Sequence, residues 1–205
     1  MKQLLSLLVL CFSLEASARE VQLPDPETLK RLKAGEVILE NTRTEESGGA
    51  ARIVIFIQAP VEAIWGVIYS CENAFIFVEG LKLCEVLEQT SDYTITRQVV
   101  KKGLLIPTQD YTFRTVQEPF RHAEFKLVDG SLKVMEGTWD FIAMPDGVVL
   151  IHEIRVQPGV PAPRFMVRQQ MRKGMPEMMA CMRGLADGSV NADMKARDLE
   201  MCPGS

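Results

Sequence analysis

The sequence predicts an α+β fold in which a curved antiparallel sheet of about six to seven strands wraps around a long C-terminal helix, with two short helices after the first strand. Three observations lead to this prediction. An apolar run at 53–57 precedes two short helical patterns. Within 81–157, segments in which apolar and polar residues alternate are separated by turn residues. A long helical pattern occupies 164–184. Strands joined by short turns pair antiparallel, so a meander is expected.

A short helical extension is expected at 19–35, before the main domain. Asp25 is a suitable N-cap, Pro26 follows it at the first helical position, and Gly35 ends the pattern. Residues 36–44 (EVILENTRT) are then a candidate strand.

The strand at 53–57 stops at Pro60, where a helix begins, because a proline is tolerated in the first helical turn. The apolar face of this helix consists of Val61, Ile64, Trp65 and Ile68. A second short helix is expected at 72–78. Six further strands are expected at 81–88, 93–100, 110–116, 122–128, 131–143 and 148–157, with a bulge at Gly137.

The closing helix at 164–184 is rich in methionine, and a kink or restart is expected at Pro176, which lacks a backbone donor. Methionine side chains repack readily around different apolar ligands, but they also fill ordinary cores, so both roles stay open. A single helix lying across six or seven strands does not easily fill the space beneath it, which favours a hollow interior. Residues 186–205 form a polar tail.

The composition bounds the functional classes. The chain of 205 residues has 47% hydrophobic residues and a net charge of −4, without a basic run, which argues against a nucleic-acid partner. Residues 1–18 are typical of a cleaved signal peptide, with Lys2, an apolar stretch and Ala16-Ser17-Ala18 at the cleavage position. We therefore expect a periplasmic or secreted protein. The alternative is a short helix that tethers the chain to a membrane.

Four cysteines remain after cleavage of this segment, namely Cys71, Cys84, Cys181 and Cys202. In an oxidising compartment they allow three pairings, and Cys71–Cys84 is the candidate disulfide because one residue follows the first helix and the other lies in the next strand. Buried free thiols are the alternative. The spacing shows no metal-binding pattern, and no metal or cofactor is predicted.

Alternation along the strands identifies the residues expected to face the interior. They are Tyr111 and Phe113 on one strand, Ala123, Phe125 and Leu127 on the next, Trp139 and Phe141 on the long strand, and His152 on the last. The closing helix adds Phe165, Met166, Met171, Met175 and Met178. Arg97 is a candidate for a ligand head group. For each of these residues, plain core packing or solvent exposure is the alternative.

Several segments together resemble the START/SRPBCC superfamily, whose helix-grip fold is shared with Bet v 1-like proteins. They are IVIFIQAPVEAIWGVI, FIFVEGLKLCEVLE, FKLVDG, MEGTWDFIAMPDGVVLIHEIRVQP and the helix at 163–183. The resemblance covers about residues 36–185 and is strongest to the polyketide cyclase/dehydrase and lipid transport branch, which includes coenzyme-Q-binding START-type proteins. It implies a cavity between sheet and C-terminal helix for a lipid, sterol, quinone or polyketide. It carries no catalytic residue to this chain.

Three functional hypotheses follow. The first is an exported carrier or sensor of a hydrophobic small molecule, expected to be monomeric, for which a transient contact with a membrane or envelope protein would be a suitable partner. The second is a cyclase or hydrolase-type enzyme that uses His152 with a carboxylate such as Glu136 or Asp140. The chain contains no recognised catalytic motif, so we predict no catalytic residues. The third is an envelope interaction module without a cavity.

Overall fold

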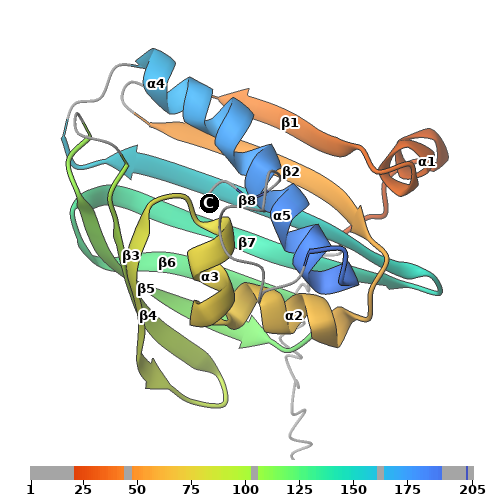
Figure 1. Ribbon diagram of the computed structural model, residues 1–205, viewed down its shortest axis with the longest axis horizontal. Coiled ribbons are helices and arrows are strands. Elements are labelled where there is room, and N and C mark those ends of the chain that lie inside the picture. Colours follow the sequence, from red (N-terminus) through yellow and green to blue (C-terminus); the bar gives the residue numbers. More distant parts are fainter. Residues whose placement is uncertain (1–20, 44–47, 103–105, 161–163, 191–201, 203–205) are drawn as a thin grey trace, which may run out of the picture.

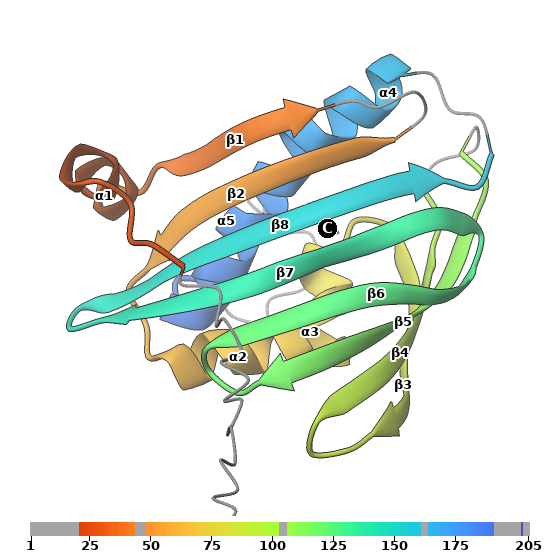
Figure 2. The same ribbon diagram turned by 180° about the vertical axis from the view of Figure 1, so that it is seen from behind.

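Eight antiparallel strands form one sheet that curls around the helices (Figures 1 and 2). This computed structural model describes residues 21–43, 48–102, 106–160, 164–190 and 202. The strands are β1 (Val37–Arg43), β2 (Gly49–Ile57), β3 (Leu81–Gln89), β4 (Tyr93–Val100), β5 (Gln109–Glu118), β6 (His122–Gly130), β7 (Leu132–Met144) and β8 (Gly147–Pro158). Their order is β1-β2-β8-β7-β6-β5-β4-β3, so the last strand returns to pair with β2.

The helical elements are α1 (Pro26–Lys33), α2 (Val61–Tyr69), α3 (Cys71–Phe77), α4 (Arg164–Gln169), the π-helical η1 (Gln170–Gly174) and α5 (Met175–Asp187). The Asp25 side chain caps α1, since it accepts hydrogen bonds from the backbone N–H groups of Glu27 and Thr28 at 3.0 Å. Ser70 caps α3 in the same way through Asn73. These caps fix where the two short helices begin.

The sheet has eight strands and not six to seven, because the candidate strand at 36–44 also joins it, as the edge strand β1. Val37 pairs with Ile55 and Leu39 with Ile53. The predicted bulge at Gly137 is also wrong, since β7 pairs regularly with both neighbours there. Glycine is required for a different reason: a Cβ atom would lie 2.0 Å from the Glu153 carbonyl oxygen and 2.6 Å from the Phe125 ring.

The C-terminal helix is interrupted where the proline predicted it. In place of one long α-helix, the chain passes from α4 through η1 into α5, which begins at Met175 with Pro176 in its first turn. Pro176 lacks an N–H and crowds the carbonyl one turn earlier. A widened π-helical turn immediately before the proline relieves this conflict.

Apolar side chains pack on both faces of the sheet. The face that curls around α5, called the concave face here, carries the main core, which includes Ile53 and Ile55 of β2. On the opposite, convex face Val54 and Phe56 pack beneath Leu32 of α1. The continuous apolar run in β2 is therefore explained by burial on both sides.

Two disulfides join elements that are distant in the sequence. Cys71 at the start of α3 pairs with Cys84 of β3, which is the pairing considered from the sequence. Cys181 of α5 pairs with Cys202, so Cys202 is fixed to the buried side of that helix. Val190 also folds back onto α5, where its side chain packs against Gly184.

The predicted signal peptide at 1–18 lies outside the described residues. Among the helices that the structure describes, none combines the length and apolar character that crossing a membrane requires.

Candidate functional site

The strand register brings most of the predicted interior residues onto one surface. Phe113 of β5 pairs with Leu127 of β6, and Ala123 pairs with Trp139 of β7, which in turn pairs with His152 of β8. Paired residues in antiparallel strands point to the same side of the sheet. These side chains therefore share the concave face, opposite the helices.

Aromatic rings run across this surface from β5 to β8. Ring centroids are 6.2 Å apart for Tyr111 and Phe113, 6.4 Å for Phe113 and Phe125, and 5.8 Å for Phe125 and His152. His152 then stacks on Trp139 at 3.6 Å with nearly parallel planes. The rings form a continuous apolar floor.

One end of this floor is fully packed. Ala123 is completely buried, and Phe125, Trp139 and Phe141 are buried as well. Trp65 of α2 covers this end, with its ring 5.1 Å from that of Phe141. These residues therefore pack in the core, which was the alternative considered for them in the sequence analysis.

The other end is only partly covered. Tyr111, Phe113 and Leu127 point to the concave side yet stay half-buried, as do Met135 of β7 and Ile154 of β8. Burial raises the pKa of the Tyr111 phenol, which therefore stays protonated. Its hydroxyl donates to the Gln98 side-chain oxygen at 3.0 Å. Apolar side chains that point inward yet keep accessible surface make this end the candidate place for a ligand.

The methionines of the C-terminal helix serve mainly as core. Met171, Met175 and Met179 are buried, and their helical elements contact β1 and β2 rather than the aromatic strands. Figure 1 shows the helix crossing that side of the sheet. Met178 is half-buried and packs at the edge of the core. The side chain of Met166 is outside the described set.

Two predicted ligand contacts are corrected by the structure. Arg97 lies on the convex face, where its guanidinium binds both carboxylate oxygens of Asp110 at 3.0 and 2.8 Å. This pair raises the pKa of Arg97 and lowers that of Asp110 through hydrogen bonding. Phe165 is 68% exposed, so it does not belong to the packed interior.

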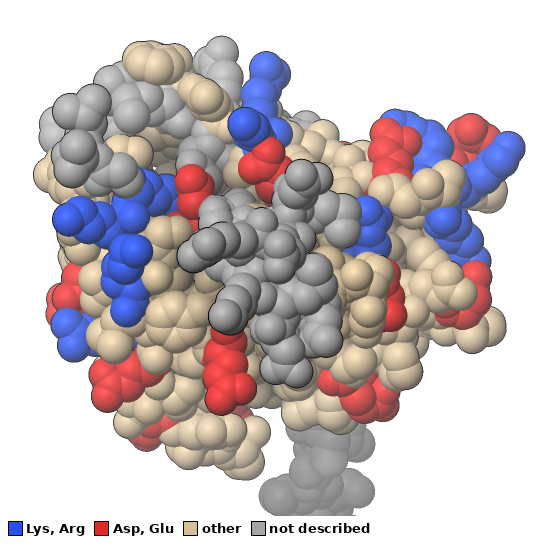
Figure 3. All heavy atoms as spheres, in the orientation of Figure 1, with Lys and Arg blue, Asp and Glu red and all other residues tan. Residues whose placement is uncertain are grey.

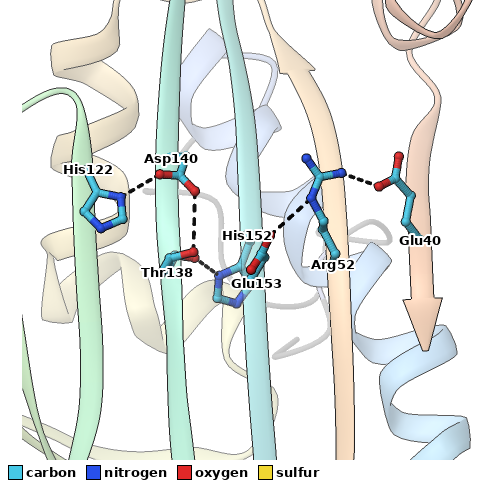
Figure 4. A network of polar contacts seen from close by, with 7 residues as sticks. All are labelled: Glu40, Arg52, His122, Thr138, Asp140, His152 and Glu153. Atoms are coloured by element: carbon cyan, nitrogen blue, oxygen red, sulfur yellow. Dashed lines mark hydrogen bonds and ion pairs between the residues drawn. The ribbon is translucent and has the colours of Figure 1, made fainter. Parts of the chain in front are cut away.

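His152 is held as a neutral imidazole. Its side chain is 2% exposed, and its Nδ1 is 3.0 Å from the backbone oxygen of Thr138 (Figure 4). Burial lowers the pKa of His152 to about 4. The pKa lies well below neutral pH, so the ring is neutral. Because a carbonyl oxygen can only accept, Nδ1 carries the hydrogen and donates a hydrogen bond to this oxygen.

The carboxylates proposed as partners of His152 lie on the other side of the sheet. Asp140 is paired with His122 at 2.5 Å and Glu136 with Arg155 at 3.1 Å, both on the convex face. Figure 4 shows a separate set of ion pairs, in which Arg52 of β2 lies between Glu153 of β8 and Glu40 of β1. The predicted acid/base set is therefore not assembled at one place.

Sequence reasoning missed two polar groups at the concave side. Gln98 of β4 was overlooked because its strand alternates weakly, and it is the partner of Tyr111. Tyr69 at the end of α2 has a buried hydroxyl to which no described residue is hydrogen-bonded. Only the spacing of four residues between Trp65 and Tyr69 could have indicated that both side chains lie on the same face of the helix.

Charged side chains surround the face that carries the helices. Figure 3 shows Lys, Arg, Asp and Glu interspersed around its rim, with uncharged surface between them. Within the described residues, no group of three or more potential metal ligands occurs.

The eight-stranded sheet curled around the C-terminal helix defines an α+β protein of the helix-grip class. The chain belongs to the polyketide cyclase/dehydrase and lipid transport family, whose model matches residues 57–183. Among curated proteins, none matches the sequence.

Solved structures share the fold at low identity. An aromatase/cyclase, Zhui, from Streptomyces sp. R1128 is 17% identical with a TM-score of 0.56, covering 72% of this chain and 99% of that one. A STAR-related lipid transfer protein from Xanthomonas axonopodis is 12% identical with a TM-score of 0.57, covering 73% and 98%. A START superfamily protein from Mycobacterium smegmatis is 16% identical with a TM-score of 0.55, covering 69% and 99%.

Proposed function

We propose that this protein binds a hydrophobic small molecule against the half-buried end of the concave face and carries or senses it outside the cytoplasm. The observation that carries the proposal is the incomplete burial of Tyr111, Phe113 and Leu127, although all three point to the interior side of the sheet. Apolar side chains in a closed core would be covered on all sides. A lipid, sterol, quinone or polyketide-like molecule would supply the missing contacts.

Export is supported by the cysteines. Both cysteine pairs, Cys71–Cys84 and Cys181–Cys202, form disulfides. Disulfides persist in oxidising compartments and are rare in the cytosol. Together with the signal-peptide pattern at 1–18, they favour a periplasmic or secreted location.

The family names both lipid transport and cyclase chemistry, and the described residues favour binding. His152 is enclosed by rings and separated from the carboxylates of Glu136 and Asp140. A transient membrane contact and a monomeric state stay predictions. Phe165 and Val160, both exposed and apolar near the start of α4, are the first positions to examine for such a contact.

Filling the proposed site tests the proposal. Leu127→Trp adds a large ring on the concave face, whereas Val128→Trp places the same ring on the next residue of β6, which is 58% exposed. We expect Leu127→Trp to weaken binding of the neutral probe N-phenyl-1-naphthylamine by roughly tenfold or more, because overpacking costs a few kcal/mol. Val128→Trp should bind like the unaltered protein.

Fluorescence titration measures both affinities, and circular dichroism checks that both variants are folded. Equal binding by the two folded variants would contradict the proposed site. No binding by the unaltered protein, even after removal of copurified lipophiles, would contradict the proposed function.

A further inference from the structure

The Tyr69 hydroxyl is a buried polar group without a hydrogen-bond partner among the described residues. More than nine in ten buried polar groups in proteins have a partner, and an unsatisfied group costs about 1–3 kcal/mol. A position that carries such a cost calls for an explanation beyond packing.

The phenol is directed into the protein. Tyr69 as a whole is half-buried, yet its hydroxyl oxygen is covered, so the accessible surface belongs to other atoms of the residue. Trp65 lies one turn earlier on α2, with its ring 4.5 Å from that of Tyr69. Because Trp65 also contacts Phe141, this side of α2 faces the concave surface.

The uncharged concave surface restricts which ligand groups can bind to the Tyr69 hydroxyl. Burial raises the pKa of Tyr69, so the phenol stays protonated and acts as a donor. In the described concave rows of β4 to β8, every side chain is apolar or uncharged, and Arg97 lies on the other face. An anionic ligand group would lose its hydration there without gaining a cation, which is costly.

We propose that Tyr69 is a specificity-determining residue that donates a hydrogen bond to a carbonyl, hydroxyl or ether oxygen of an otherwise apolar, uncharged ligand. The inference rests on the proposed function and narrows it. It selects neutral oxygenated molecules over fatty acids and other carboxylates. The packed Trp65 ring holds the phenol in place, so little side-chain freedom is lost when the ligand binds.

Three probes of nearly equal shape test this. They are 2-acetylnaphthalene, its alkene isostere 2-isopropenylnaphthalene, and the anion 2-naphthoate. Tyr69→Phe should weaken binding of the ketone by about three- to tenfold, which corresponds to one buried hydrogen bond, and leave the alkene unchanged. Naphthoate should bind more weakly than the ketone. The control Tyr93→Phe removes a hydroxyl from an exposed pair with Glu88, and it should change none of these affinities.

Thermal unfolding of the ligand-free variants provides a readout independent of binding. If the Tyr69 hydroxyl has no partner in the folded protein, Tyr69→Phe should keep or raise the Tm. A lowered Tm would overturn the inference, because it would show that the hydroxyl is already bonded. Equal loss of ketone and alkene binding, or loss of neither, would also overturn it while leaving the proposed function intact. Failure of both neutral probes to bind the unaltered protein would overturn both.

Discussion

At the scale of single residues, His152 shows how burial decides the role of a side chain. The ring lies between Phe125 and Trp139, and its Nδ1 bonds to the Thr138 backbone oxygen. Desolvation lowers its pKa to about 4. This makes it a neutral structural group at physiological pH and a poor candidate for a general base.

The lowered pKa predicts a stability change with pH. Between pH 4 and the ordinary histidine pKa of about 6.5, the unfolded chain binds the proton and the folded chain does not. The contribution to stability is therefore fully present above pH 6.5 and is lost as the pH falls toward 4. His152→Asn keeps a donor for Thr138 but does not titrate.

We expect the difference in the free energy of unfolding between pH 7 and pH 4.5 to be smaller in His152→Asn by roughly 2 kcal/mol. Urea unfolding at both pH values measures it. An unchanged pH dependence would show that His152 is protonated, or accessible to protons, in the folded state.

Periodicity could place most single residues of the concave floor, and it failed where both faces of a strand look alike. In β4 the apolar residues Tyr93, Ile95 and Val99 suggested an interior face for Arg97, but they lie on the convex side. The Tyr93 ring there is covered by Arg114, whose guanidinium carbon lies 4.1 Å from the ring centroid. The Tyr93 ring is thus covered by a charged side chain on the convex face and not by the core. Alternation alone does not distinguish these two kinds of cover.

At the scale of elements, α1 gives the convex face a second apolar layer. Leu32 is completely buried against Val54, Phe56, Val149 and Ile151. The sequence predicted this helix from its cap, but its position depends on a tertiary contact that no local pattern contains. Figure 2 shows α1 at the end of the sheet beside β1 and β2.

This contact predicts a large effect of a small change. Leu32→Ala should lower the free energy of unfolding by about 3 kcal/mol, because it removes a buried side chain and leaves a cavity. Leu23→Ala is the matched control, since Leu23 is 52% exposed, and it should change stability by less than about 0.5 kcal/mol. Chemical denaturation compares the two, and equal effects would mean that α1 does not dock in solution.

The C-terminal helix shows what a sequence leaves undetermined. Its methionine stripe could be recognised, but not which part of the sheet it would cover. Because the helix lies over β1 and β2, most of these methionines complete the core there. The concave surface of β4–β7 is left partly uncovered. Tyr111 and Phe113 lie on this face, as expected from the sequence, and Gln98 on the same face was overlooked.

At the scale of the whole molecule, the two disulfides and the sheet hold the helices around a floor that they do not fully cover. Cys71–Cys84 attaches α3 to β3, and Cys181–Cys202 attaches Cys202 to α5. The fold class could be predicted because strand alternation, turn residues and the Pro60 helix agree with one another. Incomplete packing was also expected, because one helix does not easily fill the space beneath such a sheet. Which strands would stay partly uncovered could not be predicted, since this depends on where the helix lies on the sheet.

Native mass spectrometry of the protein, purified gently without detergent, tests this incomplete packing most directly. We predict an additional neutral mass that dissociates on denaturation and is lost in Leu127→Trp but retained in Val128→Trp. A chain that carries no bound molecule, and gains none when incubated with a panel of uncharged oxygenated lipophiles, would contradict the account.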